Sequence, residues 1–163
     1  TVIPVDFDLT DYYKAIQYIE ETVYKLFRIK GNEIILGGIS SGGFLAHQVA
    51  NIIKIPAILL CPVIKPFDRH FDIPQDLQEK QLSFFHTLEN MKEIQDSVSE
   101  PNNKRFIIFG AKDNRAPFQV YSDWLSLDNV RSTIIDAGHE LCNNPPLKLF
   151  LDSLENYLNS NIQ

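Results

Sequence analysis

The chain has 163 residues, 44% of them hydrophobic and 22% charged, so it can build one globular core but not two ordinary domains. Seven Gly, nine Pro and 11% aromatic residues exclude a fibrous, low-complexity or disordered chain. The net charge of −6, without long runs of like charge, excludes the basic surface of a nucleic-acid-binding or membrane-surface protein. A small or neutral partner is therefore favoured.

Short β-branched runs alternate with longer segments of helical period, which is typical of parallel strands joined by helices. Residues 2–7 are expected to form the first strand, and Asp8 or Thr10 to cap the helix that follows. Gly31 and Asn32 are expected to end that helix. Its apolar positions recur on one face, at Tyr13, Ile16, Ile19, Val23 and Leu26.

Four further strands and three further helices complete the expected fold, a three-layer α/β/α domain over residues 1–163 with a mostly parallel sheet of about five strands. The more polar segment 65–103, with interspersed phenylalanines, is expected to form a lid inserted over the sheet. The strands are predicted at 33–36, 56–61, 105–109 and 130–135, and the helices at 44–53, at 117–127 and from 145 or 146 onward.

A Gly-Ile-Ser-Ser-Gly sequence at 38–42 fits the G-x-S-x-G pattern between a predicted strand and a predicted helix. A sharp strand-to-helix turn there exposes the hydroxyl of Ser40, and any side chain at Gly38 or Gly42 is expected to clash. The same turn aims the backbone N–H of Ser41 at the position where an oxyanion would develop. Ser40 is therefore the candidate nucleophile, and it is favoured over the adjacent Ser41 because only Ser40 has glycine at both −2 and +2.

A nucleophilic serine needs a base, and the base needs an acid that orients it. Asp113 follows the strand predicted at 105–109, and His139 follows the strand predicted at 130–135. Because the carboxyl ends of parallel strands meet at one edge of a sheet, Ser40, Asp113 and His139 are expected to converge. Rival acids and histidines lie at less favourable positions: Asp123, Asp128, Asp136, His47, His70 and His86.

These residues resemble the α/β-hydrolases, and among them the small YqiA-like esterases, over nearly the whole chain. The resemblance rests on Gly-Ile-Ser-Ser-Gly-Gly at 38–43, on Ile-Pro-Ala at 55–57 leading through Pro62 to Lys-Pro-Phe at 65–67, on Gly110 with Asp113, and on Gly138 with His139. It implies Ser40 as nucleophile, His139 as general base and then acid, Asp113 as orienting acid, and the Ser41 N–H as one oxyanion donor.

The chain departs from that family at one point. The family has earlier strands and a His-Gly loop that supplies the second oxyanion N–H, and this sequence contains no such segment. Loss of one oxyanion donor costs about 10²–10³ in rate, so a replacement donor, for example from the lid backbone, is needed for efficient turnover. Without one, the chain would be a hydrolase-fold binding or regulatory module.

The sequence therefore predicts a serine esterase or thioesterase that forms an acyl-enzyme on a small ester substrate. A dinucleotide site is disfavoured because the turn lacks G-x-G-x-x-G, and neither a cofactor nor a metal cluster is expected. Cys61 and Cys142 are expected to be free thiols of a cytoplasmic protein, and no run of residues is long enough to span a membrane. A homodimer is expected if the first strand leaves an exposed edge.

Overall fold

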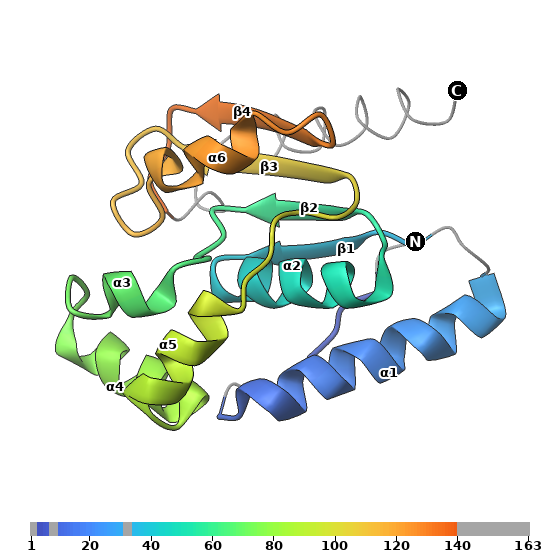
Figure 1. The fold of residues 1–163 in the computed structure, drawn as a ribbon, viewed down its shortest axis with the longest axis horizontal. Helices are drawn as coiled ribbons and strands as arrows, with labels where there is room; N and C mark the ends of the chain where they lie inside the picture. Colours follow the sequence, from blue (N-terminus) through green and yellow to red (C-terminus); the bar gives the residue numbers. More distant parts are fainter. Residues whose placement is uncertain (1–2, 7–9, 31–33, 140–163) are drawn as a thin grey trace.

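The computed structural model describes residues 3–6, 10–30 and 34–139 of the chain. Strands and helices alternate along this part, and the segment between β2 and β3 holds three helices (Figure 1). The elements in chain order are α1 (Tyr12–Lys30), β1 (Leu36–Ile39), α2 (Ser41–Ile53), β2 (Ala57–Leu60), α3 (Pro66–His70), α4 (Gln75–Phe85), α5 (Leu88–Asp96), β3 (Arg105–Gly110), the 3₁₀ turn η1 (Phe118–Tyr121), α6 (Ser122–Leu125) and β4 (Val130–Ile135).

The sheet has the strand order β1-β2-β3-β4, and every pair of neighbours is parallel. The α/β class is therefore confirmed, with four strands in the described part instead of about five. The strand predicted at 2–7 is wrong for the residues that can be described, because 3–6 have no regular structure. Pro4 lacks a backbone N–H to donate, and Ile3 is 45% exposed, so this segment neither joins a ladder nor buries its apolar side chain.

The other predicted strands are found, with one shift in position. β1 begins at Leu36, where the prediction ended, and runs through Gly37 and Gly38 to Ile39. Sequence reasoning ended the strand at the first glycine, but Gly37 pairs with Ile58 and Gly38 with Leu59 in the parallel ladder. The pairing with β2 therefore overrides the weak strand propensity of glycine.

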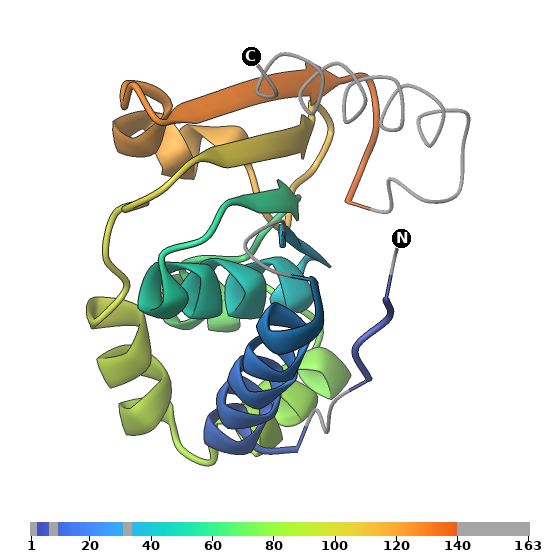
Figure 2. The ribbon, with the colours of Figure 1, turned by 90° about the vertical axis from the view of Figure 1, so that its right-hand side faces the viewer.

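The two inner strands, β2 and β3, are buried along their whole length and separate two apolar clusters. Ala57, Leu59, Ile107 and Phe109 face the larger cluster, to which all the described helices contribute side chains. Figures 1 and 2 show α1 alongside α2 on this side of the sheet. Ile58, Leu60, Phe106 and Ile108 face a smaller cluster on the other side. The final helix predicted from 145 or 146 lies outside the described residues.

Helix α1 begins at Tyr12 and is capped by Asp11, one position after the predicted Thr10, while Asp8, the other predicted cap, lies outside the described residues. The Asp11 side chain accepts a hydrogen bond from the Lys14 backbone N–H at 3.1 Å, which satisfies one of the free donors of the first turn. The buried face is turned relative to the prediction: Tyr12 and Ala15 are buried, whereas Tyr13 is 55% exposed. Every helix in the described residues, α1 included, is too short or too polar to cross a lipid bilayer.

The segment 65–103 forms α3, α4 and α5, and in Figure 1 α3 and α4 lie toward the carboxyl ends of the strands. Two phenylalanines of α4, Phe84 and Phe85, are buried against Tyr12 of α1. The helix predicted at 117–127 is present as two short pieces, η1 and α6, because the 3₁₀ turn after Pro117 changes the helical pitch at Tyr121.

A buried polar cluster joins α2 to the chain that enters β3. His47 Nε2 donates to the Ser99 carbonyl at 3.0 Å, and the ring lies 4.4 Å from that of Trp124. Asn51 accepts from the guanidinium of Arg105 at 2.5 Å. Burial first, and the nearby Arg105 charge second, lower the pKa of His47 to about 3. His47 is therefore a structural, neutral histidine and takes no part in the candidate site.

We expect the stability of the fold to fall in acid because of His47. Its pKa is about 3 in the folded chain and about 6.5 when unfolded, so between these values the unfolded chain binds the extra proton. The free energy of unfolding should then fall by up to about 1.4 kcal/mol per pH unit between pH 6 and 4. Urea titrations of the native chain and of His47→Gln, which cannot titrate, measure this slope. Equal slopes in the two proteins would refute the assignment.

Candidate active site

Ser40 is the single residue that separates β1 from α2. Its backbone has φ 53° and ψ −120°, a strained conformation for a residue with a side chain. Three backbone hydrogen bonds hold it there: its N–H donates to Leu60 at 2.9 Å, and its carbonyl accepts from Phe44 at 3.1 Å and Val63 at 3.3 Å. The turn expected from the sequence is therefore present, and β2 together with the first turn of α2 fixes its strain.

The glycines around Ser40 have different roles from those predicted. A Cβ atom on Gly38 would lie 2.1 Å from the Gly42 carbonyl oxygen, so glycine is required at 38 as expected. A Cβ on Gly42 would meet no atom within 4 Å, so the clash predicted there is wrong. The second close approach is instead at Gly43, whose Cβ would lie 3.0 Å from Pro62. The helix enters the turn with Gly42 facing open space and Gly43 facing the β2 loop.

The loop after β3 positions Asp113. One carboxylate oxygen accepts the backbone N–H groups of Arg115 at 2.8 Å and Ala116 at 2.9 Å, which fixes the side chain. At Gly110 a Cβ would lie 2.5 Å from the Ala137 carbonyl oxygen, so this glycine lets the loops after β3 and β4 come into contact. The Lys112 N–H donates to that same carbonyl at 2.9 Å. Asp113 and His139 are thereby brought side by side.

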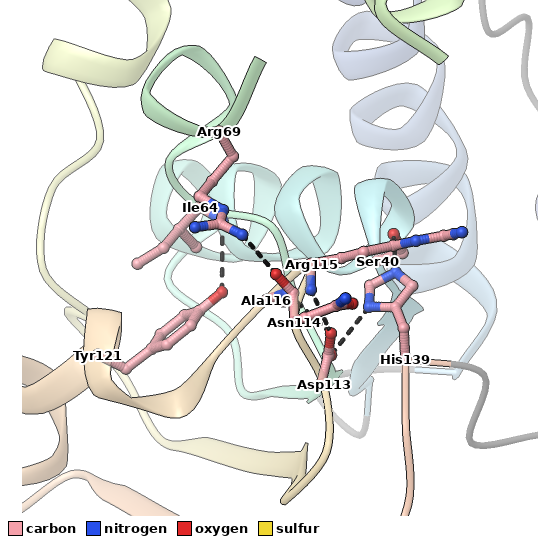
Figure 3. A network of polar contacts seen from close by, with 9 residues as sticks. All are labelled: Ser40, Ile64, Arg69, Asp113, Asn114, Arg115, Ala116, Tyr121 and His139. Atoms are coloured by element: carbon pink, nitrogen blue, oxygen red, sulfur yellow. Dashed lines mark hydrogen bonds and ion pairs between the residues drawn. The ribbon is translucent and has the colours of Figure 1, made fainter. Parts of the chain in front are cut away.

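Ser40, His139 and Asp113 form one continuous chain of hydrogen bonds. The Ser40 hydroxyl and His139 Nε2 are 2.8 Å apart, and His139 Nδ1 lies 2.9 Å from the second carboxylate oxygen of Asp113 (Figure 3). The Asp113 side chain is fully buried and that of His139 is 12% exposed. A carboxylate at Nδ1 keeps the proton on that nitrogen, so Nε2 is free to accept the proton of the serine.

The pKa of Asp113 is lowered, although its burial by itself raises it. Hydrogen bonds from the Ala116 N–H, from His139 and from the Cys61 thiol outweigh the burial and favour the ionised carboxylate. Cys61 is a buried cysteine at the end of β2, with a positive φ of 41°. Its contact with Asp113 joins positions 52 residues apart, and the sequence contained no signal for it. Cys142 lies outside the described residues.

Cys61, Asp113 and His139 also form the one group of potential metal ligands in the described part of the chain. Their ligand atoms lie within 4.8 Å of one another. Two of these groups are joined by the His139–Asp113 hydrogen bond, and the thiol hydrogen-bonds to the same carboxylate. The potential ligand atoms of these three side chains are therefore already engaged in hydrogen bonds with one another.

The rival residues lie elsewhere. Asp136 pairs with Lys112 at 2.7 Å on the surface, and His70 is buried with Nδ1 2.8 Å from Gln81. His86 lies 3.5 Å from Asp11 near the start of α1. Ser41 is exposed, and as the first residue of α2 it belongs to the turn whose N–H groups have no partner within a helix. Of these candidates in the described part of the chain, only His139 is hydrogen-bonded to Ser40, and only Asp113 is hydrogen-bonded to His139.

A family model matches residues 7–143, which is most of the chain: that of the uncharacterised protein family UPF0227. The chain belongs to the UPF0227 family. A search of the curated proteins finds no match to it. The described fold and the order of the strand-end residues agree with the resemblance seen in the sequence.

Solved structures place this UPF0227 chain in the α/β-hydrolase fold. It is similar to Est1E from Butyrivibrio proteoclasticus, with TM-score 0.72 and 15% identity over 96% of this chain and 73% of that one. A second is MGS-MChE2, an α/β hydrolase enzyme from a sediment metagenome of the Mar Chica lagoon in Morocco, with TM-score 0.64 and 19% identity over 97% and 75%. A third is a monoacylglycerol lipase of Paleococcus ferrophilus, with TM-score 0.63 and 12% identity over 89% and 75%.

A pocket of about 390 Å³ opens beside Ser40 and His139 in the UPF0227 chain. Its walls come from the start of α2 and from α3 and α4, so the segment predicted as a lid does border the site. Apolar side chains such as Phe44, Leu77 and Phe84 form much of the lining. Phe84 both packs α4 against Tyr12 of α1 and lines the pocket.

Proposed function

We propose that this chain is a serine hydrolase that cleaves a carboxylic ester or thioester through an acyl-enzyme on Ser40. The proposal is carried by one observation, the hydrogen-bonded line from Ser40 through His139 to Asp113. The strained backbone at Ser40 supports it, because such strain is characteristic of functional positions. The fold is also that of proteins named as a hydrolase and a lipase.

In the proposed acylation step, the Ser40 oxygen attacks the ester carbonyl carbon while its proton moves to His139 Nε2. The carbonyl oxygen becomes an oxyanion near the N-terminus of α2, where the backbone N–H of Ser41 donates to it. The intermediate then collapses, His139 returns the proton to the leaving alkoxide or thiolate, and the acyl group remains on Ser40.

In the proposed deacylation step, a water molecule takes the position of the leaving group and loses a proton to His139 as it attacks the acyl carbon. Collapse of the second intermediate releases the carboxylic acid and returns the proton to Ser40. Asp113 remains ionised throughout, since its pKa is lowered, and it stabilises the positive charge that His139 carries in both steps.

Labelling with a fluorophosphonate tests this proposal, because such reagents trap a serine only when it is activated as a nucleophile. We expect the native chain to be labelled on Ser40 and Ser40→Ala to remain unlabelled. Ser41→Ala, which keeps the backbone N–H, should still be labelled and serves as the adjacent control. If the native chain does not react, or if Ser40→Ala is labelled equally, the hydrolase proposal fails and a binding module with the hydrolase fold is favoured.

The buried thiol of Cys61 is expected to support the reaction through Asp113. Cys61→Ala removes one hydrogen bond to the carboxylate, whereas Cys61→Ser keeps a donor at the same backbone conformation. A hydrogen bond to a charged group contributes about 1–2 kcal/mol, so kcat for ester hydrolysis should fall roughly 5- to 30-fold in Cys61→Ala. Cys61→Ser should retain most of the activity. Equal losses in both variants would show that packing, and not the hydrogen bond, matters there.

A further inference from the structure

The pocket beside Ser40 contains three cationic side chains and, among the described residues, no acidic one. Arg69 comes from α3, Lys80 from α4 and Arg115 from the loop after β3. The chain as a whole has 21 acidic against 15 basic residues, so a basic pocket runs against the overall charge. This local excess of positive charge is the feature that the hydrolase proposal leaves unexplained.

Arg69 is held in place but is not fully satisfied. Its guanidinium lies 3.3 Å from Asp72 and donates to the backbone carbonyl of Asn114, which ties α3 to the loop after β3 (Figure 3). Its Nε is buried and has no hydrogen-bond partner among the described residues. A buried N–H without a partner is costly in a folded protein, so this Nε–H is available to donate to an acceptor other than the described residues.

Lys80 and Arg115 have no ion pair with any acidic side chain of the described part of the chain. By contrast Lys112, in the same loop as Arg115, pairs with Asp136 at 2.7 Å and does not line the pocket. Arg115 is fixed through its backbone, because its N–H binds Asp113, while its side chain extends toward Ser40 and His139 in Figure 3. Its charge therefore lies where a bound substrate would be.

We propose that this pocket selects esters that carry a negatively charged oxyacid group, a carboxylate or a phosphate, next to a short apolar portion. The proposal rests on the proposed function, since Ser40 marks where the ester carbonyl is bound. Phe44, Leu77 and Phe84 contact the apolar portion, and Lys80 and Arg115 bind the anion. Arginine and lysine are the side chains that proteins use for such groups.

The test compares charged esters with a neutral one. The charged substrates are the 4-nitrophenyl monoester of glutaric acid, 4-carboxyphenyl butyrate and the butyrate ester of 4-hydroxyphenyl phosphate, which place the anion on the acyl group or on the leaving group. The neutral reference is 4-nitrophenyl pentanoate. Each charged substrate is expressed as kcat/KM relative to the reference and then compared between proteins, so that intrinsic reactivity cancels.

We expect at least one of these ratios to fall tenfold or more in the double variant Lys80→Gln/Arg115→Gln. Each of the two substitutions removes one attractive charge interaction with the anionic group of the substrate. The ratio should also fall as salt is raised, because the two side chains are exposed. Lys112→Gln, the matched control, should leave it unchanged, and Lys80→Arg/Arg115→Lys should restore it. If every ratio stays within twofold in the double variant, the proposal is wrong.

Binding separates this proposal from the hydrolase proposal. Ser40→Ala cannot form an acyl-enzyme, and calorimetry can measure its affinity for the intact glutarate monoester. The triple variant Ser40→Ala/Lys80→Gln/Arg115→Gln is compared with Ser40→Ala alone. A tenfold weaker affinity of the triple variant supports anion binding, even if fluorophosphonate labelling of the native chain fails. Unchanged affinity overturns it, even if labelling succeeds.

Discussion

Replacing Asp113 by Asn is expected to lower kcat for ester hydrolysis about 10⁴-fold. The oxygen of Asp113 that accepts the Arg115 and Ala116 N–H groups can only be replaced by the amide oxygen of Asn. The amide NH₂ group is then forced to face His139 Nδ1, which must accept. The imidazole proton therefore moves to Nε2, where it blocks transfer from Ser40.

Steady-state kinetics of Asp113→Asn on 4-nitrophenyl esters measure this loss, and thermal melting verifies that the variant is folded. The control is Asp136→Asn in the neighbouring loop, which removes a surface pair with Lys112 and should leave kcat unchanged. A loss below tenfold in a folded Asp113→Asn protein would mean that the carboxylate has no orienting role.

Replacing Gly38 by Ala is expected to cost about 3 kcal/mol or more of stability, or to prevent folding. The added Cβ would lie 2.1 Å from the Gly42 carbonyl oxygen and 2.7 Å from the Gly43 nitrogen, and both are backbone atoms that cannot rotate away. Relief requires β1 and α2 to separate at the turn, which also displaces Ser40. Urea unfolding measures the change in stability.

Gly42→Ala is the matched control, four positions along the same turn. Its Cβ would meet nothing within 4 Å, and alanine is a better helix former than glycine, so the variant should be equally stable or up to about 1 kcal/mol more stable. If Gly42→Ala destabilises the chain as much as Gly38→Ala does, the prediction that a Cβ atom is tolerated at position 42 and not at position 38 is wrong.

Much of the fold could be predicted because its inner strands give a simple signal. β2 and β3 were located within one residue, since a buried parallel strand is a nearly continuous apolar run. The positions of Ser40, Asp113 and His139 followed from the ends of predicted strands, both inner and outer, without any knowledge of contacts. Residues 3–6 carried a similar apolar signal, but Pro4 and the exposure of Ile3 exclude them from a ladder.

The contacts made between distant elements could not be predicted. The Cys61 thiol meets Asp113 only because β2 and β3 are neighbours in the sheet, and the Arg69–Asn114 contact depends on how α3 folds back. The symmetry of the G-x-S-x-G pattern suggested equal crowding at both glycines, whereas the helix turns Gly42 outward and Gly43 inward. The homodimer, the cytoplasmic location and the lid role of segment 65–103 stay predictions.

The sequential strand order gives the Ser40–His139 contact a further meaning. β1 and β4 are the two outermost strands of the described sheet, so this contact links loops that follow opposite edges across two intervening strands. A slip of one residue in any strand pairing would move an edge by about 3.3 Å, more than a hydrogen bond can absorb. Titration of Ser40 with a fluorophosphonate would thus measure the fraction of molecules in which all three strand pairings are in the correct register.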